Sequence, residues 1–361
     1  MSRMNGAVLL VGSIPGETAT EVMRTCAEGV GNYLSCLPDG ETSYRRMWIN
    51  FLAATVYHGN PALETVKRPK PIDGKESWIP SGYDDHWLFQ LKGGSSSVHF
   101  DHLGYANEAK KSYQDFCALR SQGVIPASVK FQVALPLTES AIRPFLARAE
   151  DFVPMWSAYE EAMGRELAQL VRDIPAEDLA VQWDICVEVV AIAVGDQHEG
   201  LLAWKPQGDP FDRYLRALKT VAQHVPSETR MGCHLCYGDL GHRHFVEPTD
   251  LSLVVRMANA ARKAVDRPID FYHMPVPRNR DDEAYFAPLK DLDIGEAKLY
   301  LGLIHHTDGV QGARKRLATA RKYASGFGIA TECGFGRRPQ DTIPDLLRIH
   351  REIADALSAG R

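Results

Sequence analysis

The segment "GCHLCYGDLGHRH", residues 232–244, holds three histidines and two cysteines. Residues two apart on a strand share a face, so His234 and Cys236 project together while Cys233 projects to the other side. An imidazole beside a thiolate suits zinc, which takes nitrogen and sulfur ligands in a tetrahedral shell. A buried thiol beside a hydrogen-bonded histidine is the alternative. His242 and His244 follow the expected end of the strand and are predicted to lie in a loop near the site.

Cys333, in the segment "TECGFGRRP", adds a third candidate ligand at the end of another expected strand. If the two strands end at one mouth, His234, Cys236 and Cys333 supply three protein ligands and leave a fourth position open. That arrangement is typical of a catalytic zinc site. Two thiolates make such a zinc electron-rich, which favours holding a substrate thiolate over activating water.

The elements that must position these residues alternate between strands and helices. Eight short β-rich runs are predicted as strands: 7–12, 33–37, 129–135, 180–186, 229–236, 268–274, 298–304 and 326–332. Segments with helical periodicity follow most of them: 139–172, 209–224, 249–265, 309–324 and 341–358. The alternation predicts a parallel sheet, and eight units favour an α/β fold of the (β/α)8 TIM barrel type, with residues 1–361 as a single domain. An open doubly wound sheet is the rival.

Polar side chains at the strand ends favour the closed barrel. They include Ser13, Asp39, Glu41, Asp184, His273 and His305, besides the three candidate ligands. The carboxyl ends of barrel strands converge on one mouth, where active sites lie. An open sheet would leave the first and last strands far apart.

Residues 57–104, after the second strand, do not follow the strand–helix repeat. The stretch is rich in Pro, Gly and Ser, and its aromatic residues are Trp78, Tyr83, Trp87, Phe89 and Phe100. Loops of this length commonly act as lids over a site. An inserted lid is therefore predicted, with an inserted subdomain or an oligomer contact as the alternatives.

Composition excludes several classes of function. The net charge is −5 with no long basic run, which argues against nucleic acid as a partner. No stretch of about 18 apolar residues or signal peptide is evident, so neither membrane insertion nor export is expected. Seven thinly spread cysteines are typical of a reduced, cytoplasmic protein. An oligomer is compatible with the sequence.

Four ordered motifs resemble one known family. "VGSIPGETATE" at 11–21, "PDGETSYRR" at 38–46, "HLCYGD" at 234–239 and "ECGFGRRP" at 332–339 resemble the C-terminal catalytic barrel of cobalamin-independent methionine synthase and its single-barrel relatives. That family shares a superfamily with uroporphyrinogen decarboxylase. The resemblance implies a (β/α)8 barrel in which zinc binds and activates a thiol that attacks an alkyl group. His234, Cys236 and Cys333 match the family's zinc ligands.

Two strands depart from the family pattern. Methionine synthases have a glutamate ligand after the sixth strand, where this chain reads "FYHMPVPR". His273 is therefore expected either to replace that ligand or, with Tyr272, to contact substrate; a structural histidine is the third possibility. The related epoxyalkane:coenzyme M transferases use two cysteines and one histidine. In "VQWDICVEV" Asp184 remains, but Ile185 stands where the family has a glutamate that helps to hold homocysteine, so homocysteine is not the expected substrate.

Further residues are predicted to act at the mouth. Glu41 matches a family glutamate, and Asp39 lies two positions away, so the pair could bind a cation or act as acid and base, unless it lies in a solvated turn. The family also places a catalytic histidine near "LGLIHHTDG", where His306 aligns better than His305.

Arginines in the loops after strands six and eight are expected to hold an anionic tail of the substrate. Arg278 and Arg337 are the candidates, together with Arg280 and Arg338, because an arginine fork suits carboxylate and phosphate groups. A solvated basic surface is the alternative.

The predicted function is a zinc-dependent transfer of a methyl or alkyl group to a thiol. His306, Glu41 and Asp184 are the candidate catalytic residues, and Ser13, Asp39, His273, Arg278 and Arg337 the candidate substrate contacts. One barrel makes folate use in the manner of the tandem enzyme unexpected, so the donor is an epoxide, a methoxylated aromatic compound or a methylated corrinoid, the last carried by a corrinoid protein as partner. A metal-dependent lyase, decarboxylase or hydrolase of the same superfamily is the alternative, followed by a non-catalytic metal-binding or corrinoid-binding protein.

Overall fold

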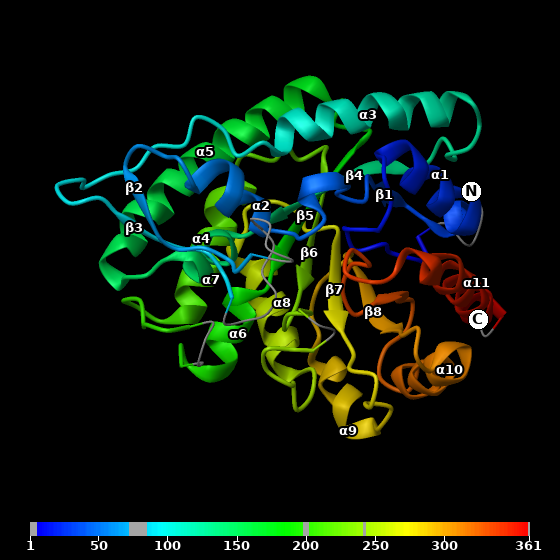
Figure 1. Cartoon of the computed structure of the whole chain (residues 1–361). Helices are drawn as coiled ribbons and strands as arrows, with labels where there is room; N and C mark the ends of the chain where they lie inside the picture. Colours follow the sequence, from blue (N-terminus) through cyan, green and yellow to red (C-terminus); the bar gives the residue numbers. More distant parts are fainter. Residues whose placement is uncertain (1–5, 72–84, 198–201, 241–242, 360–361) are drawn as a thin grey trace.

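A computed structural model describes residues 6–71, 85–197, 202–240 and 243–359. Its main sheet has seven parallel strands in the order β1-β4-β5-β6-β7-β8-β9, and it curls about its own axis (Figure 1). The strands are β1 (Cys36–Pro38), β4 (Lys130–Pro136), β5 (Leu179–Ile185), β6 (Arg230–Leu235), β7 (Phe271–Pro275), β8 (Lys298–Ile304) and β9 (Gly328–Thr331).

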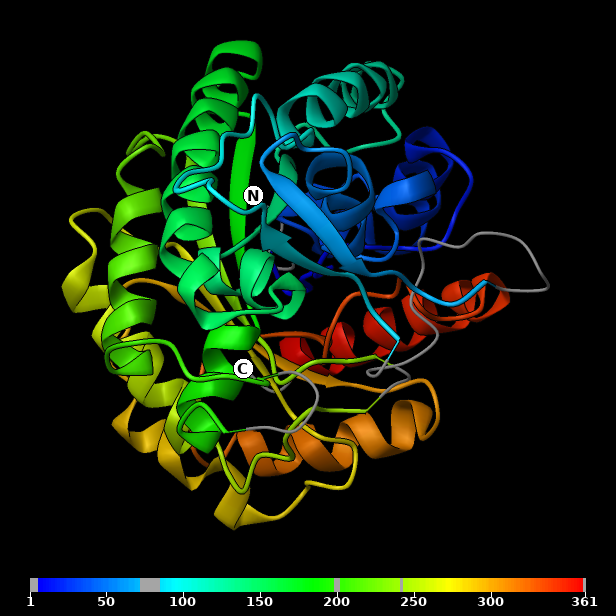
Figure 2. The same cartoon turned by 60° about the vertical axis from the view of Figure 1, so that its left-hand side comes forward.

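Helices cover the outside of the curled sheet (Figure 2). The helices among the described residues are α1 (Ala19–Val30), α2 (Asn50–Leu52), α3 (Tyr105–Ser121), α4 (Thr138–Ile142), α5 (Phe152–Asp173), α6 (Val187–Val194), α7 (Pro210–Ala222), α8 (Ser252–Ala264), α9 (Glu283–Phe286), α10 (Gly309–Ala320) and α11 (Ile343–Ala359). The N- and C-terminal helices meet, because α1 packs on α11. In the described part of the chain, no helix combines the length and the apolar character needed to cross a membrane.

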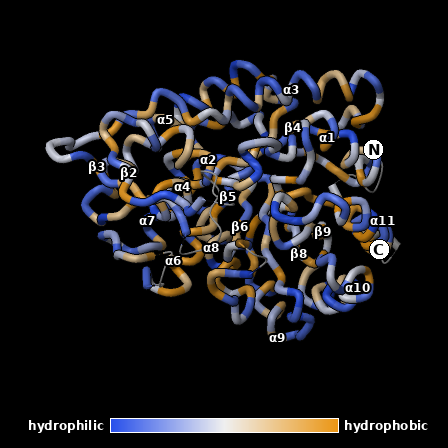
Figure 3. The backbone as a smooth tube through the Cα atoms, viewed as in Figure 1, coloured by the Kyte–Doolittle hydropathy of each residue, from blue (hydrophilic) through white to orange (hydrophobic). Residues whose placement is uncertain are grey.

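The sequence explains why the strands are central. Every residue of β5 is buried, as expected for a parallel strand covered on both faces. Outer helices such as α3 and α10 alternate hydrophilic and hydrophobic residues along their length (Figure 3). In α7, Pro210 occupies the first turn, and the Asp209 side chain accepts hydrogen bonds from two backbone N–H groups at the helix start.

The register between neighbouring strands brings candidate site residues to one level. Asp184 on β5 pairs with His234 on β6, and His234 pairs with His273 on β7. Because successive parallel strands end at the same edge, side chains from β5, β6 and β7 meet there.

The first predicted strand, 7–12, is not a regular strand. Val8 forms isolated parallel bridges with Leu34 and Ile329, and so connects the two edges of the sheet. Beyond this point the Val11 carbonyl accepts hydrogen bonds from the side chains of Gln132, at 3.1 Å, and Gln182, at 2.5 Å. Interior glutamines thus replace the backbone partners that a strand would use.

One further expectation needs correction, and the predicted lid role of residues 57–104 stays a prediction. The predicted helix 139–172 is divided into α4 and α5, and the break contains Pro144, which cannot donate a backbone hydrogen bond. The stretch 57–104 contains the antiparallel strands β2 (Leu63–Lys67) and β3 (Leu88–Leu91). In this stretch Trp87, Phe89 and Phe100 are buried in the core, whereas Trp78 and Tyr83 lie outside the described residues.

Candidate metal centre and its cavity

A cavity of about 140 Å³ lies at the carboxyl ends of β5, β6 and β9. Its lining includes six of the residues predicted from the sequence: Ser13, Asp184, His234, Cys236, Cys333 and Arg337. These residues are separated by up to about three hundred positions in the chain, and the curled sheet brings them together.

His234, Cys236 and Cys333 form a cluster that could hold a metal ion. Their nearest nitrogen and sulfur atoms all lie within 4.8 Å of one another. The Cys333 Sγ is 4.0 Å from the Cys236 Sγ and 3.8 Å from the His234 Nε2. Ligand atoms in a tetrahedral zinc site lie roughly 3.6–3.8 Å apart, given the usual zinc–sulfur and zinc–nitrogen bond lengths. The three side chains therefore fit a zinc ion with little adjustment.

The electrostatics of the two thiols also favour a cation. The pKa of Cys333 lies well above its usual value because of its contact with Cys236 and its burial, although Arg337 opposes the shift. The pKa of Cys236 is also raised, and its contact with Cys186 makes the largest contribution. Two neighbouring buried thiols do not ionise easily, and a bound metal ion supplies the positive charge that stabilises thiolates.

His273 lies behind His234 and does not line the cavity. Its Nδ1 is 2.6 Å from the His234 Nδ1, and its Nε2 is 3.0 Å from the Thr331 carbonyl oxygen. Burial lowers the pKa of His273 to about 3 and, with the neighbouring ring, keeps the pKa of His234 well below its usual value. Both imidazoles are therefore neutral, and the His234 Nε2 faces the thiols.

Asp184 is one of two aspartates that line the cavity, the other being Asp239. Its Oδ1 accepts a hydrogen bond from Gln182 at 2.9 Å, and its Oδ2 accepts one from the Trp48 indole at 3.1 Å. Burial raises the pKa of Asp184 well above its usual value, and the nearby Glu41 raises it further. Burial thus favours the protonated form of Asp184.

The predicted pair of Asp39 and Glu41 is buried but does not line the cavity. Despite burial, Arg45 at 2.7 Å holds the pKa of Asp39 below its usual value, so Asp39 is ionised and serves a structural ion pair. Burial raises the pKa of Glu41 to about 7, and the Ser13 hydroxyl bonds to it. The alternative that Asp39 and Glu41 lie in a solvated turn is therefore wrong.

Neither candidate arginine has the arrangement predicted for binding an anionic tail of the substrate. Arg337 lines the cavity, but it donates hydrogen bonds to the backbone oxygen and the carboxylate of Asp239, at 2.9 and 2.8 Å. It also lies 3.4 Å from the Cys333 Sγ. Arg278 does not line the cavity, and it bonds Thr307 at the surface.

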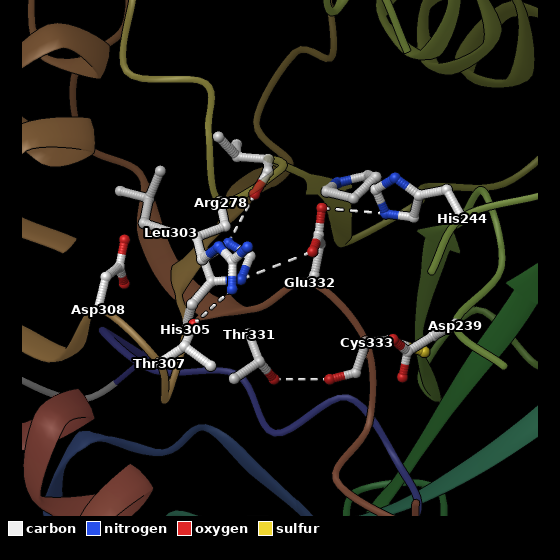
Figure 4. Close-up of polar contacts among 12 residues, drawn as sticks. Asp239, His244, Arg278, Leu303, His305, Thr307, Asp308, Thr331, Glu332 and Cys333 are labelled. Atoms are coloured by element: carbon white, nitrogen blue, oxygen red, sulfur yellow. Dashed lines mark hydrogen bonds and ion pairs between the residues drawn. The ribbon is translucent and has the colours of Figure 1, made fainter. Parts of the chain in front are cut away.

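The histidines after β8 are directed elsewhere. His306 does not line the cavity and lies 3.5 Å from the Asp345 carboxylate on α11. His305 is buried, 3.6 Å from Glu332, whose other oxygen pairs with His244 at 3.0 Å (Figure 4). Although burial opposes it, the ion pair with Glu332 raises the pKa of His244 to about 9. His242 lies outside the described residues.

Cys186 and Trp48 are among the cavity residues that the sequence analysis did not identify. Cys186 lies two positions after Asp184, so the alternation that paired His234 with Cys236 could have identified it. Trp48 carries a positive φ of 52°, which is rare for a bulky residue. No sequence signal marks that conformation.

Comparisons with known proteins find a solved structure that shares the fold of this chain. No family model and no curated protein matches the sequence. A B12-independent methionine synthase from Shewanella sp. W3-18-1, solved in complex with selenomethionine, has a similar structure, with a TM-score of 0.61, 15% identity and coverage of 98% of both chains. A methyltransferase from Methanosarcina mazei gives a TM-score of 0.47 at 12% identity, over 95% of this chain and 94% of that chain. The first match shows that the fold is shared.

Proposed function

We propose that the protein is a zinc-dependent enzyme that transfers a methyl or alkyl group to a thiol, on a barrel closed by the segment around Val8. One observation carries the proposal: the His234 nitrogen and the Cys236 and Cys333 sulfurs converge beside a cavity. The fold shared with a methionine synthase is compatible with it.

Zinc held by these three residues would keep one coordination position for a substrate thiol, lower its pKa and leave it nucleophilic. The chain's own residues would do the rest. His234 offers the Nε2 lone pair because its Nδ1 is engaged with His273. Arg337, 3.4 Å from the Cys333 sulfur, would stabilise the thiolate form of Cys333.

Asp184 is the residue placed to protonate the leaving group. In the transfer, the thiol sulfur forms a bond to the alkyl carbon, and the bond from that carbon to the leaving atom breaks with its electron pair. Asp184 lines the cavity, and in its protonated form, which burial favours, it would donate a proton to that atom. The proton that the thiol loses would return to the Asp184 carboxylate, so that the transfer consumes no net proton.

The experiment is metal analysis of freshly purified protein, followed by a thiol alkylation assay. About one zinc per chain is expected in the unmodified protein, and Cys333→Ser is expected to lose both the zinc and the thiol-dependent turnover. Cys117→Ser, a half-buried cysteine on α3 away from the cavity, is the matched control and should retain both. Absence of zinc, or turnover that needs no thiol, would contradict the proposal and favour a lyase or hydrolase.

A further inference from the structure

We propose that the cavity accepts the alkyl donor through an uncharged aromatic group. The inference rests on the proposed function in one respect, because that function identifies the bound ligand as the alkyl donor. Apolar side chains make up much of the cavity wall around His234, Cys236 and Cys333, called here the metal cluster: Met47, Trp48, Ile49, Pro144, Phe145, Val187, Leu240 and Phe245. They come from the segment after β1, the break after α4, the start of α6 and the loop after β6.

Arg337 and the carboxyl group of Asp184, two ionisable groups in the wall, already have partners within the protein. Arg337 is the one arginine or lysine among the described lining residues, and both of its hydrogen bonds to Asp239 hold it in place. Asp184 accepts a hydrogen bond at each oxygen. A carboxylate or phosphate on the ligand would have to displace Asp239 from Arg337, and burial of an unpaired charge is strongly unfavourable.

Aromatic side chains favour a flat ligand. Trp48, Phe145 and Phe245 all line the cavity, and aromatic groups gain from offset or edge contacts with one another. Trp48 is fixed as a wall, because its indole N–H bonds Asp184 and its backbone is held in the left-handed region. A rigid aromatic wall loses little freedom when a ligand binds.

The test compares anisole with 4-methoxybenzoate on the metal-free protein without any thiol. The two probes share the ring and the methoxy group and differ by one carboxylate. Ligand-observed NMR titration is expected to give anisole at least ten-fold tighter binding. Trp48→Leu should weaken anisole at least three-fold, and Val153→Asn, at an exposed position on α5, should leave it unchanged.

A second variant tests the pairing of Arg337. Asp239→Asn removes the carboxylate partner and should tighten 4-methoxybenzoate at least three-fold with little effect on anisole. Equal or tighter binding of 4-methoxybenzoate to the unmodified protein, or no anisole binding, overturns the proposal. Neither readout involves zinc, so loss of the proposed metal chemistry would leave this result standing, and the reverse also holds.

From a separate observation, the hydrogen bonds behind the cluster, we infer that His273 is a positioning residue that fixes the tautomer of His234. A carbonyl oxygen only accepts, so the His273 Nε2 that faces the Thr331 oxygen carries the proton. The His273 Nδ1 is then an acceptor, and the protonated His234 Nδ1 donates a hydrogen bond to it. The His234 Nε2 is left with a free lone pair toward the two sulfurs.

The first readout needs no metal. In the metal-free protein, ¹⁵N–¹H correlation of the imidazoles should show His234 protonated at Nδ1, and His273→Leu should convert a large part of it to the Nε2-protonated form. Zinc affinity, measured by chelator competition, should fall ten- to hundred-fold in His273→Leu, as is usual when the group that orients a histidine ligand is lost.

His273→Gln is the conservative control, since its amide can donate to Thr331 and accept from His234. It should recover most of the zinc affinity that His273→Leu loses. Protonation of His234 at Nε2 in the unmodified protein, or equal zinc affinity in His273→Leu, overturns the inference.

Discussion

Two polar clusters in the protein interior differ in how their groups are satisfied. In the ion cluster, defined as Glu139, Arg143, Asp196 and Arg213, two cations face two carboxylates at 2.6–3.0 Å. The metal cluster, His234, Cys236 and Cys333, contains no opposite charges and directs its lone pairs at one point. Charges that cancel within the chain join α4, α6 and α7, whereas converging donors leave room for a ligand.

The largest expected effect comes from breaking the ion cluster. Arg143→Met leaves Glu139 and Asp196 short of a cation at 0% side-chain exposure and should lower the free energy of unfolding by about 3–5 kcal/mol. Urea denaturation measures the change. Lys111→Met, which breaks an exposed pair with Glu108, is the control and should change stability by no more than about 1 kcal/mol. A loss below about 1 kcal/mol in Arg143→Met would contradict the stabilising role of the ion cluster.

A pH dependence is expected from Glu41. Burial raises its pKa to about 7 from 4.5, so between these values the folded protein keeps a proton that the unfolded chain releases. The contribution is complete below pH 4.5 and is lost as the pH rises through 7, by about 3 kcal/mol in total. Glu41→Gln should flatten this fall in denaturation curves measured from pH 4.5 to 8.

Glu188 offers the parallel measurement beside the ion cluster. Burial and Glu139 raise its pKa to about 7 as well. Glu188→Gln should therefore flatten the same window by a similar amount. An unchanged slope in Glu41→Gln would show that the carboxyl near the cavity is ionised in the folded protein.

Loss of a metal ligand should act through zinc alone. The metal-free forms of Cys236→Ser and the unmodified protein should differ by no more than about 1 kcal/mol, because no ion pair is broken. Zinc at a hundred times its Kd should stabilise the unmodified protein by about 2.7 kcal/mol and leave Cys236→Ser unchanged. Thermal unfolding with and without zinc measures both. Equal stabilisation of the two would place the metal elsewhere.

The smallest effect is expected from Trp48→Phe. The change removes the indole N–H that donates to Asp184 and should cost about 1 kcal/mol in the free energy of unfolding. Zinc affinity should stay the same, because Trp48 touches none of the three candidate ligands through a hydrogen bond. A changed zinc affinity would show that the cavity wall and the metal cluster are coupled.

The strands and most helices could be predicted because burial leaves a periodic pattern. Seven of the eight predicted strands are present, and α7, α8, α10 and α11 lie close to their predicted ranges. The first strand could not be corrected from the pattern, because Gln132 and Gln182 replace its partners from more than a hundred positions away. Pro144 could have signalled the break in 139–172.

The candidate site could likewise be predicted only in part from the sequence. The shared side of His234 and Cys236 follows from strand alternation, and their meeting with Cys333 follows from a common mouth. The positions of His273, His306 and Arg337 could not be read in advance, since each depends on a neighbour from another element: His234, Asp345 and Asp239.

Residue type and spacing alone determined which donors the chain offers and which of them share a face, because both are local properties of the backbone. Only the tertiary structure decided which donors meet and which are already bonded, because those outcomes depend on distances across the curled sheet. His273 thus contacts the candidate ligand His234, and Arg337 pairs with the carboxylate of Asp239. The cavity that remains beside the metal cluster is lined mainly by apolar side chains.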